Sequence, residues 1–331
     1  MRLLHSRHDV GAAELPVEGS LPGFEGATGW LNSEPLTTDA LRGRIVLVDF
    51  WTYTCINWLR TLGWVRAWAD RYADDGLVVV GVHTPEFPFE RDVDNVRRAV
   101  AEMDVRYPVA LDSRYDVWRA FANNYWPAVY IADADGRIRH HHFGEGGYEE
   151  CERAVQQLLR ESGREVGGEL VAPVLEGFEV QADWSTLQTP ETYLGYEQSE
   201  NFAAARGEGG AYEIPDRLGL NQWALAGDWT VGPGAVRLNG AEGRIAFRFH
   251  ARDVHLVMGP AQRDEPVPFR VLLDGEPPGA AHGFDVDERG EGTLSEQRLH
   301  QLIRQQGQIE SRTLELEFLS PGAEGYCLTF G

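Results

Sequence analysis

The chain has 331 residues, a length that allows two domains, each with its own hydrophobic core. Its formal net charge of -22 is spread along the chain and argues against binding to nucleic acid or to anionic membranes, which need a basic surface. No apolar run approaches the roughly 18 residues of a membrane span, and the N-terminal segment lacks a signal-peptide pattern. Together with only three cysteines, this composition predicts a cytoplasmic protein without a disulfide framework.

The first part of the chain alternates predicted strands and helices. Residues 1–20 lack periodicity and are predicted to form an arm, and residues 21–43 a hairpin that leads into the first domain. The elements expected next are a strand at 45–51, a helix that begins at Cys55 and stops before Gly76, a strand at 77–82, helices near 93–103 and 113–121 separated by a short strand at 109–111, a hairpin of strands 129–133 and 137–143, and a last helix that ends at Gly163. This order predicts an α/β domain at 21–165, with helices covering a mainly parallel sheet.

The pattern changes at about residue 168. Glycine and proline become frequent, and short alternating apolar runs replace the helical spacing. Leu314, Leu316 and Phe318, for example, alternate with glutamates. Residues 168–331 are therefore predicted to form an all-β sandwich or jelly roll.

Cys55 is the first candidate for chemistry. It follows the predicted buried strand directly and stands at the start of a helix, with Thr54 as the expected N-cap. The unpaired N–H groups and the dipole of a helix N-terminus favour a thiolate, which is the nucleophilic form of cysteine. The position therefore predicts a reactive thiol. Cys151 and Cys327 fall on apolar patterns and are predicted to be core residues.

The stretch Val48-Asp49-Phe50-Trp51-Thr52-Tyr53-Thr54-Cys55 resembles the signature of the thioredoxin superfamily, and of its TlpA/DipZ-type redoxins in particular. The resemblance implies a thioredoxin fold in which Asp49 is the buried carboxylate of the family. It further implies that Pro127, after Trp126, is the cis-proline that faces Cys55. Residues 189–196 and 326–331 are similar to the DipZ C-terminal region, which in that family is a jelly roll resembling carbohydrate-binding modules.

The chain departs from this family at one position of the motif. The family pattern is C-x-x-C, whereas this chain reads Cys55-Ile56-Asn57-Trp58. A dithiol enzyme escapes its mixed disulfide when the second cysteine attacks, and Trp58 cannot do so. Dithiol turnover within the motif is therefore excluded, and Asp49 lacks the second cysteine that it serves in the family.

Three functional interpretations remain open. Cys55 is a monothiol that exchanges disulfides with a protein or a small-molecule thiol, or it is a one-cysteine peroxidase, or the chain is a non-catalytic binding or scaffold protein. The spacing of Thr52 and Cys55 resembles the T-x-x-C of peroxiredoxins, and Arg60 and Arg119 are the candidates for the arginine that a peroxidase needs.

Two further sets of residues have competing interpretations. His83 and Glu86 follow the second buried strand at the sheet edge expected for Cys55, so they are candidate proton carriers as well as candidates for a hydrogen bond within the loop. The second domain carries aromatic residues that either stack on carbohydrate or form the β core and the contact with the first domain, namely Trp184, Tyr193, Tyr196, Trp223 and Trp229. A homo-oligomer is a further expectation, and no metal site or cofactor is predicted, because consecutive histidines such as His140–142 alternate between strand faces.

Overall fold

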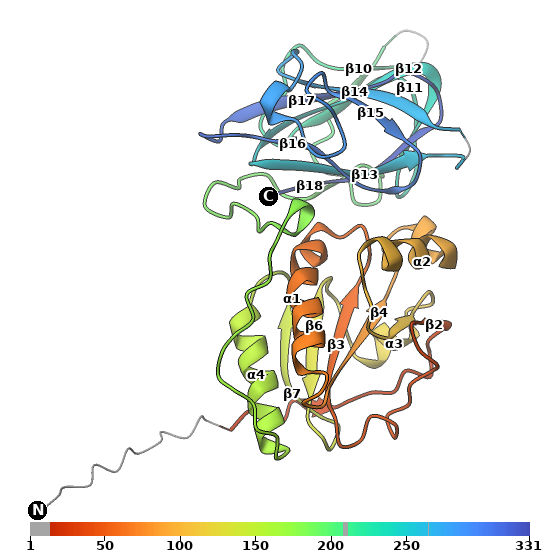
Figure 1. The fold of residues 1–331 in the computed structure, drawn as a ribbon. Helices are drawn as coiled ribbons and strands as arrows, with labels where there is room; N and C mark the ends of the chain where they lie inside the picture. The colour runs from red at the N-terminus through yellow and green to blue at the C-terminus, as the bar shows by residue number, and fades with distance from the viewer. Residues whose placement is uncertain (1–13, 208–210, 264) are drawn as a thin grey trace, which may run out of the picture. The chain divides into compact units, whose positions relative to one another are not determined.

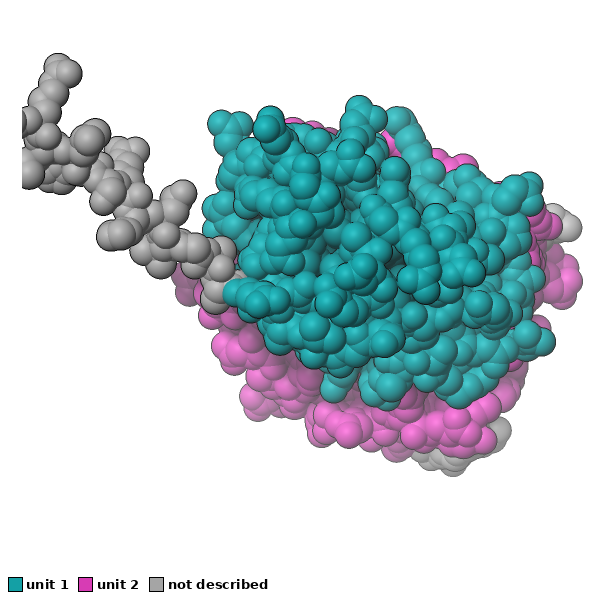
Figure 2. Space-filling view, turned by 90° about the horizontal axis from the view of Figure 1, so that it is seen from below, with its two compact units in different colours: residues 1–51, 64–84, 105–173 teal, residues 52–63, 85–104, 174–331 magenta. Residues whose placement is uncertain are grey.

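The computed structural model describes residues 14–207, 211–263 and 265–331 (Figure 1). These residues divide into two compact units, which Figure 2 shows in different colours. The α/β unit comprises the residues through Trp51 together with 64–84 and 105–173. The β-rich unit comprises residues 52–63, 85–104 and 174–331, so it includes Cys55 and the start of the helix that follows.

The α/β unit contains a seven-stranded sheet in the order β1-β7-β6-β3-β4-β5-β2. Strands β3, β4 and β5 are parallel, and the other pairs are antiparallel. Trp51 and His83, the last residues of β3 and β4, lie opposite each other. The strands are β1 (Gly19–Ser20), β2 (Gly29–Leu31), β3 (Ile45–Trp51), β4 (Leu77–His83), β5 (Val109–Leu111), β6 (Ala128–Ala132) and β7 (Arg137–Phe143).

Helices cover both faces of this sheet. The valines of β3 and Phe50 pack against α3 (Asp116–Ala120), through Val117 and the neighbouring Phe121. Because side chains alternate along a strand, Asp49 points to the opposite face. There α4 (Tyr148–Glu161) packs on the sheet (Figure 1). Its buried Glu152 accepts hydrogen bonds from Trp68 (3.2 Å) and Tyr72 (2.6 Å) of α1 (Ile56–Tyr72).

This arrangement confirms the predicted thioredoxin fold. The strand at 45–51 has the predicted bounds, because a run that is apolar apart from Asp49 is buried on both sides of a central strand. The hairpin predicted at 21–43 is wrong: β2 pairs with β5 at one edge of the sheet, while β1 pairs with β7 at the other. Two short strands therefore close the two edges separately.

Besides the start of α1, the β-rich unit contains the α-helix α2 (Val93–Glu102) and an antiparallel sheet of eleven strands. Its longest path runs β15-β14-β17-β12-β11-β10-β9, and β18 pairs with β12, β13 and β8, so the sheet curls into a half-barrel. The strands are β8 (Thr192–Tyr193), β9 (Ala205–Arg206), β10 (Tyr212–Glu213), β11 (Trp223–Val231), β12 (Val236–His250), β13 (Asp253–Pro260), β14 (Val267–Leu273), β15 (Glu291–Leu294), β16 (Arg298–Arg304), β17 (Ser311–Phe318) and β18 (Ala323–Phe330).

The inner face of this sheet forms the largest apolar cluster of the β-rich unit. Leu314, Leu316 and Phe318 of β17 point into it, as their alternation with glutamates predicted. Trp223 and Trp229 are also buried there. The all-β prediction for the C-terminal part is thereby confirmed.

Among the described residues, the structure contains no helix that combines the length and the hydrophobicity of a membrane span.

Candidate functional site

Cys55 occupies the residue before the first helical position of α1. The helix begins at Ile56, and the Cys55 carbonyl accepts the first helical hydrogen bond, from the Leu59 N–H (3.0 Å). The Thr54 cap predicted from the sequence is therefore wrong, because the cap position belongs to Cys55 itself. The Thr54 hydroxyl instead donates to Glu90 (2.6 Å).

Glu90 joins two loops around Cys55. It lies in a short 3₁₀ helix (Pro88–Arg91), and its carboxylate is fully buried. One oxygen accepts from Thr54, and the other accepts from the N–H groups of Glu86 (2.6 Å) and Phe87 (2.8 Å). Burial raises the pKa of Glu90, and these donors oppose that shift. The carboxylate therefore fixes the loop that precedes Cys55 to the loop that carries Glu86.

Thr52 lies near the same carboxylate. Its hydroxyl helps to lower the pKa of Glu90. Within the described part of the chain, however, this hydroxyl has no partner at the distance and angle of a regular hydrogen bond. The Thr52 carbonyl accepts from the Cys55 N–H at 3.2 Å. Thr52 therefore contributes to the turn that presents Cys55.

The Cys55 thiol experiences opposing electrostatic influences. The backbone N–H groups of Asn57 and Trp58 bond to it and lower its pKa, as expected at a helix N-terminus. Burial has a larger effect, and the negative charges of Glu86 and Glu191 add to it, so the pKa of Cys55 is raised well above its ordinary value. The residue as a whole is half-buried. The net direction is opposite to that predicted from the helix alone.

Glu86 is the charged group that acts most strongly on the pKa of Cys55. The Tyr193 hydroxyl donates a hydrogen bond to its carboxylate. Burial raises the pKa of Glu86 to about 8, with further contributions from the charges of Glu191 and Glu90. At neutral pH this group therefore holds a proton in most of the molecules.

Strands of the C-terminal region complete these surroundings. Tyr193 of β8 lies opposite Cys327 of β18, and the Cys327 thiol donates to Glu191 at 3.7 Å. The neighbouring Tyr326 ring contacts Phe87 (5.3 Å between centroids) and Phe89 (4.9 Å). Tyr193 and Glu86 belong to the same compact unit, the β-rich unit.

Four predicted site residues lie in the α/β unit, namely Asp49, His83, Trp126 and Pro127. Asp49 is fully buried, and its carboxylate helps burial to raise the pKa of Tyr107. His83 is buried against the Trp51 ring at 4.8 Å, and burial lowers the pKa of His83 to about 3, so its imidazole is neutral at physiological pH. A neutral, enclosed imidazole favours the structural interpretation of His83 over proton transfer.

The peptide bond between Trp126 and Pro127 is cis, as the resemblance implied. The Trp126 indole donates to the Thr84 carbonyl at 3.1 Å and packs on Trp118 at 4.3 Å between ring centroids. These contacts hold the segment that leads into β6.

Trp58 is fully buried. It occupies the last position of the C-x-x-W motif, so a large apolar ring fills the place where the family pattern has a thiol. The ring excludes water from the first turn of α1.

Sequence reasoning missed four residues around Cys55, namely Glu90, Glu191, Tyr193 as a partner of Glu86, and Cys327 as a donor to Glu191. Glu90 had a local signal, because a carboxylate in a loop after a buried strand can bind the backbone of its own turn. The other three come from more than a hundred residues away, and no local pattern connects them with Cys55.

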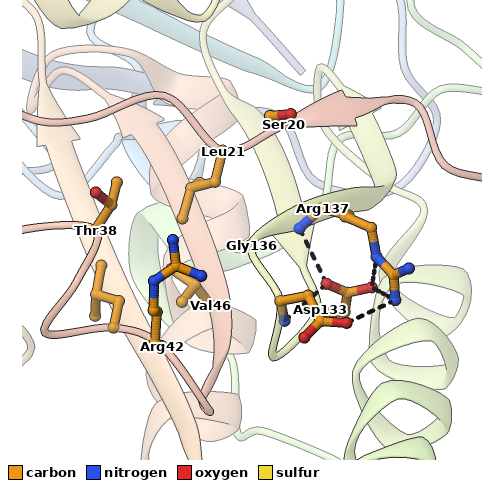
Figure 3. A pocket seen from close by; sticks show the side chains of 10 residues that line it. Ser20, Leu21, Thr38, Arg42, Val46, Asp133, Gly136 and Arg137 are labelled. Carbon is orange, nitrogen blue, oxygen red and sulfur yellow. Dashed lines mark hydrogen bonds and ion pairs between the residues drawn. The ribbon is translucent and has the colours of Figure 1, made fainter.

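A pocket of about 260 Å³ lies in the α/β unit, at the other end of β3 from Trp51 (Figure 3). Val46 and Leu41 line it, together with Arg137, which is held by Asp133 at 2.8 Å. It contains none of the residues predicted for the site.

Two family descriptions match the chain. Residues 17–141 match the AhpC/TSA family, and residues 189–331 match the thioredoxin like C-terminal domain. The chain is 39% identical over 277 residues to Protein DipZ of Mycobacterium tuberculosis, which is 81% of this chain but only 38% of that protein. It thus spans well under half the length of this relative.

A shorter relative is covered almost completely. The chain is 31% identical over 148 residues to Thiol-disulfide oxidoreductase YkuV of Bacillus subtilis, which is 45% of this chain and 99% of that protein. A solution structure of a thioredoxin-like protein in its oxidized form shares 32% identity at a TM-score of 0.41, and the match covers 44% of this chain and 99% of that one.

Proposed function

Because the chain belongs to the thioredoxin-like redoxin family that includes thiol-disulfide oxidoreductases, we propose that it exchanges disulfides through Cys55 as its only motif thiol. The observation that carries the proposal is the position of Cys55, a half-buried residue, at the N-terminus of α1, with two backbone N–H groups bonded to its thiol and Glu86 close by. The substrate class is a protein or small-molecule disulfide.

Glu86 supplies the proton acceptor for this chemistry. Its carboxylate form, which prevails above about pH 8, can take the Cys55 proton and return it to the departing thiolate. Tyr193 holds that carboxyl by a hydrogen bond and thereby positions it. The thiolate of Cys55 attacks a disulfide sulfur, and a mixed disulfide forms as the leaving thiolate is protonated.

The raised pKa of Cys55 sets the direction of exchange. Oxidising family members stabilise the thiolate, which makes their reduced form favourable. Here burial, Glu86 and Glu191 destabilise the thiolate, so the reduced chain gives up electrons more readily. We therefore propose that the protein reduces disulfides rather than forming them.

The first prediction tests Cys55 directly. When the folded chain is mixed with the disulfide of thionitrobenzoate, we expect it to release the coloured thiolate rapidly. The Cys55→Ser variant should show no rapid release. Cys151→Ser is the matched control and should keep the rapid phase, because the Cys151 thiol is buried on α4 and its pKa is raised to about 12. Equal rapid release by the wild type and Cys55→Ser would contradict the proposal.

The second prediction concerns the charge of Glu86. In the wild type this carboxylate becomes charged as the pH rises through about 8 and then opposes ionisation of Cys55. Glu86→Gln lacks that charge, so above pH 8 we expect its Cys55 to be alkylated about tenfold faster, while the two rates converge below pH 7. The measurement is the pH dependence of iodoacetamide labelling, followed by mass spectrometry.

The exposed Glu242 provides a control, since Glu242→Gln should leave the profile unchanged. A wild-type and a Glu86→Gln profile that coincide up to pH 10 would show that Glu86 does not act on the thiol.

A peroxidase is the second candidate, because residues 17–141 match the AhpC/TSA family and Thr52 lies three residues before Cys55. Peroxide would then be the oxidant. Arg60, one candidate for the required arginine, is buried and donates to the Phe330 carbonyl (3.5 Å), and Arg119 pairs with Asp116 at 2.6 Å. Consumption of hydrogen peroxide that depends on both Cys55 and Thr52 would favour this function over disulfide exchange.

The finer sequence predictions stay proposals: domains at 21–165 and 168–331, a jelly-roll topology, a cytoplasmic location and a homo-oligomer. Binding or scaffolding without catalysis is the alternative function. Carbohydrate binding has its best support in the exposed side chains of Trp184 and Tyr196, because Trp223 and Trp229 are buried in the β core.

A further inference from the structure

Two chains of contacts connect the surroundings of Cys55 to those of Cys327. On one side, Thr54 binds Glu90, and the loop of Glu90 places the Phe87 and Phe89 rings against Tyr326. On the other side, Arg60 donates to the Phe330 carbonyl and lies against Gly331.

These contacts flank both thiols. Thr54 and Arg60 lie on either side of Cys55 along the chain, while Tyr326 and Phe330 lie on either side of Cys327. The first turn of α1 therefore runs beside the end of β18.

Cys327 faces away from the core of its own sheet. Leu328 and Phe330 belong to the inner apolar cluster, and alternation along β18 places Cys327 on the opposite face. There its thiol donates to Glu191, and Tyr193 lies opposite it across the strand pair. Cys327 is buried, as the sequence predicted for a core residue, but on the face of β18 opposite to the inner apolar cluster.

The two thiols share the same acidic neighbours. Glu86 and Glu191 act electrostatically on Cys55 and also on Cys327. Tyr193 connects the two thiols structurally, since its backbone lies opposite Cys327 and its hydroxyl binds Glu86. Cys55, Glu86, Tyr193, Glu191 and Cys327 thus form one cluster.

We propose that Cys327 is the resolving thiol for Cys55, in place of the thiol that the C-x-x-W motif lacks. The inference rests on the proposed disulfide exchange at Cys55. After Cys55 has formed a mixed disulfide with a substrate, the Cys327 thiolate attacks the Cys55 sulfur. A bond forms between Cys55 and Cys327, the bond to the substrate breaks, and the second substrate thiolate leaves.

Atoms and electrons balance in this sequence. The substrate disulfide gains two electrons and two protons and becomes two thiols, while Cys55 and Cys327 lose them and form one disulfide. Glu191, which already accepts from the Cys327 thiol, takes its proton. An external dithiol then reduces the internal disulfide and returns the chain to its starting state.

The test counts thiolates released from the disulfide of thionitrobenzoate by the full chain. The wild type should release two thiolates per chain and end with an internal disulfide, which mass spectrometry of a non-reduced digest identifies as Cys55 linked to Cys327. Cys327→Ser and Cys327→Ala should release one and retain a thionitrobenzoate adduct on Cys55. Cys151→Ser is the matched control and should behave as the wild type.

The outcomes separate the two proposals. Release of a single thiolate by the wild type, with a stable adduct on Cys55, overturns the role of Cys327 and leaves exchange at Cys55 intact. A link from Cys55 to Cys151 also overturns it. If Cys55 of the folded wild type forms neither adduct nor link, the proposed function itself fails and the inference fails with it.

Discussion

Replacing Glu90 by alanine is expected to lower the free energy of unfolding by about 3 to 5 kcal/mol, because a buried charged hydrogen-bond acceptor is lost. In the native chain its two oxygens accept from the Thr54 hydroxyl and from the N–H groups of Glu86 and Phe87. Alanine leaves these buried donors without an acceptor and opens a cavity beside the Cys55 turn. Urea denaturation at pH 7, followed by tryptophan fluorescence, measures the loss.

Glu90→Gln is the informative control. The glutamine oxygen can accept from the two N–H groups, and its amide can donate to the Thr54 oxygen if that hydroxyl rotates. The substitution also removes a carboxylate whose pKa burial raises, so we expect stability within about 1 kcal/mol of the wild type. If glutamine and alanine destabilise equally, the network does not hold the loop.

The raised pKa of Glu86 predicts a pH dependence of stability with a definite sign. A carboxyl whose pKa is higher in the folded state binds its proton more tightly there, so its stabilising contribution is complete below its unfolded value of 4.5. The contribution is lost as the pH rises through about 8. The free energy of unfolding of Glu86→Gln should lack this decline, which urea denaturation between pH 5 and pH 9 measures by comparison with the wild type.

The elements of the α/β unit were predictable because their signals are local. The run at 45–51 is apolar throughout apart from Asp49, as a central strand buried on both faces requires, and the helix that follows has apolar residues at spacings of three and four. The edge strands β1 and β2 could not be predicted, because strands of two and three residues are too short to show an alternating apolar pattern. Their partners β7 and β5 are also distant in sequence.

The site was predictable only in part, for the same reason. Cys55 and Glu86 follow the ends of buried strands, so their candidacy could be read from topology. Tyr193 and Cys327 reach this site through the pairing of β8 with β18, a long-range contact that no spacing in the sequence reveals. The direction of the Cys55 pKa shift was missed because it depends on burial and on Glu191, which comes from the same distant region.

Introducing a thiol at position 58 is expected to change both chemistry and stability. Trp58 is fully buried, so Trp58→Cys should lower the free energy of unfolding by about 3 to 5 kcal/mol through the cavity that it leaves. Positions 55 and 58 are neighbours at the start of α1, because the Trp58 N–H bonds to the Cys55 thiol. The new cysteine can therefore attack a mixed disulfide on Cys55 directly.

Trp58→Ala isolates the thiol from the cavity, since it leaves a similar space without sulfur. We expect both variants to be destabilised. Only Trp58→Cys should form a disulfide between Cys55 and the introduced thiol. This variant should also keep releasing two thiolates per chain when Cys327 is replaced by serine. Mass spectrometry of non-reduced digests distinguishes this link from the native pair. If the double variant Trp58→Cys, Cys327→Ser retains a stable adduct on Cys55, a cysteine at position 58 cannot resolve the mixed disulfide. The absence of a thiol at position 58 would then not explain why a resolving thiol is needed elsewhere in the chain.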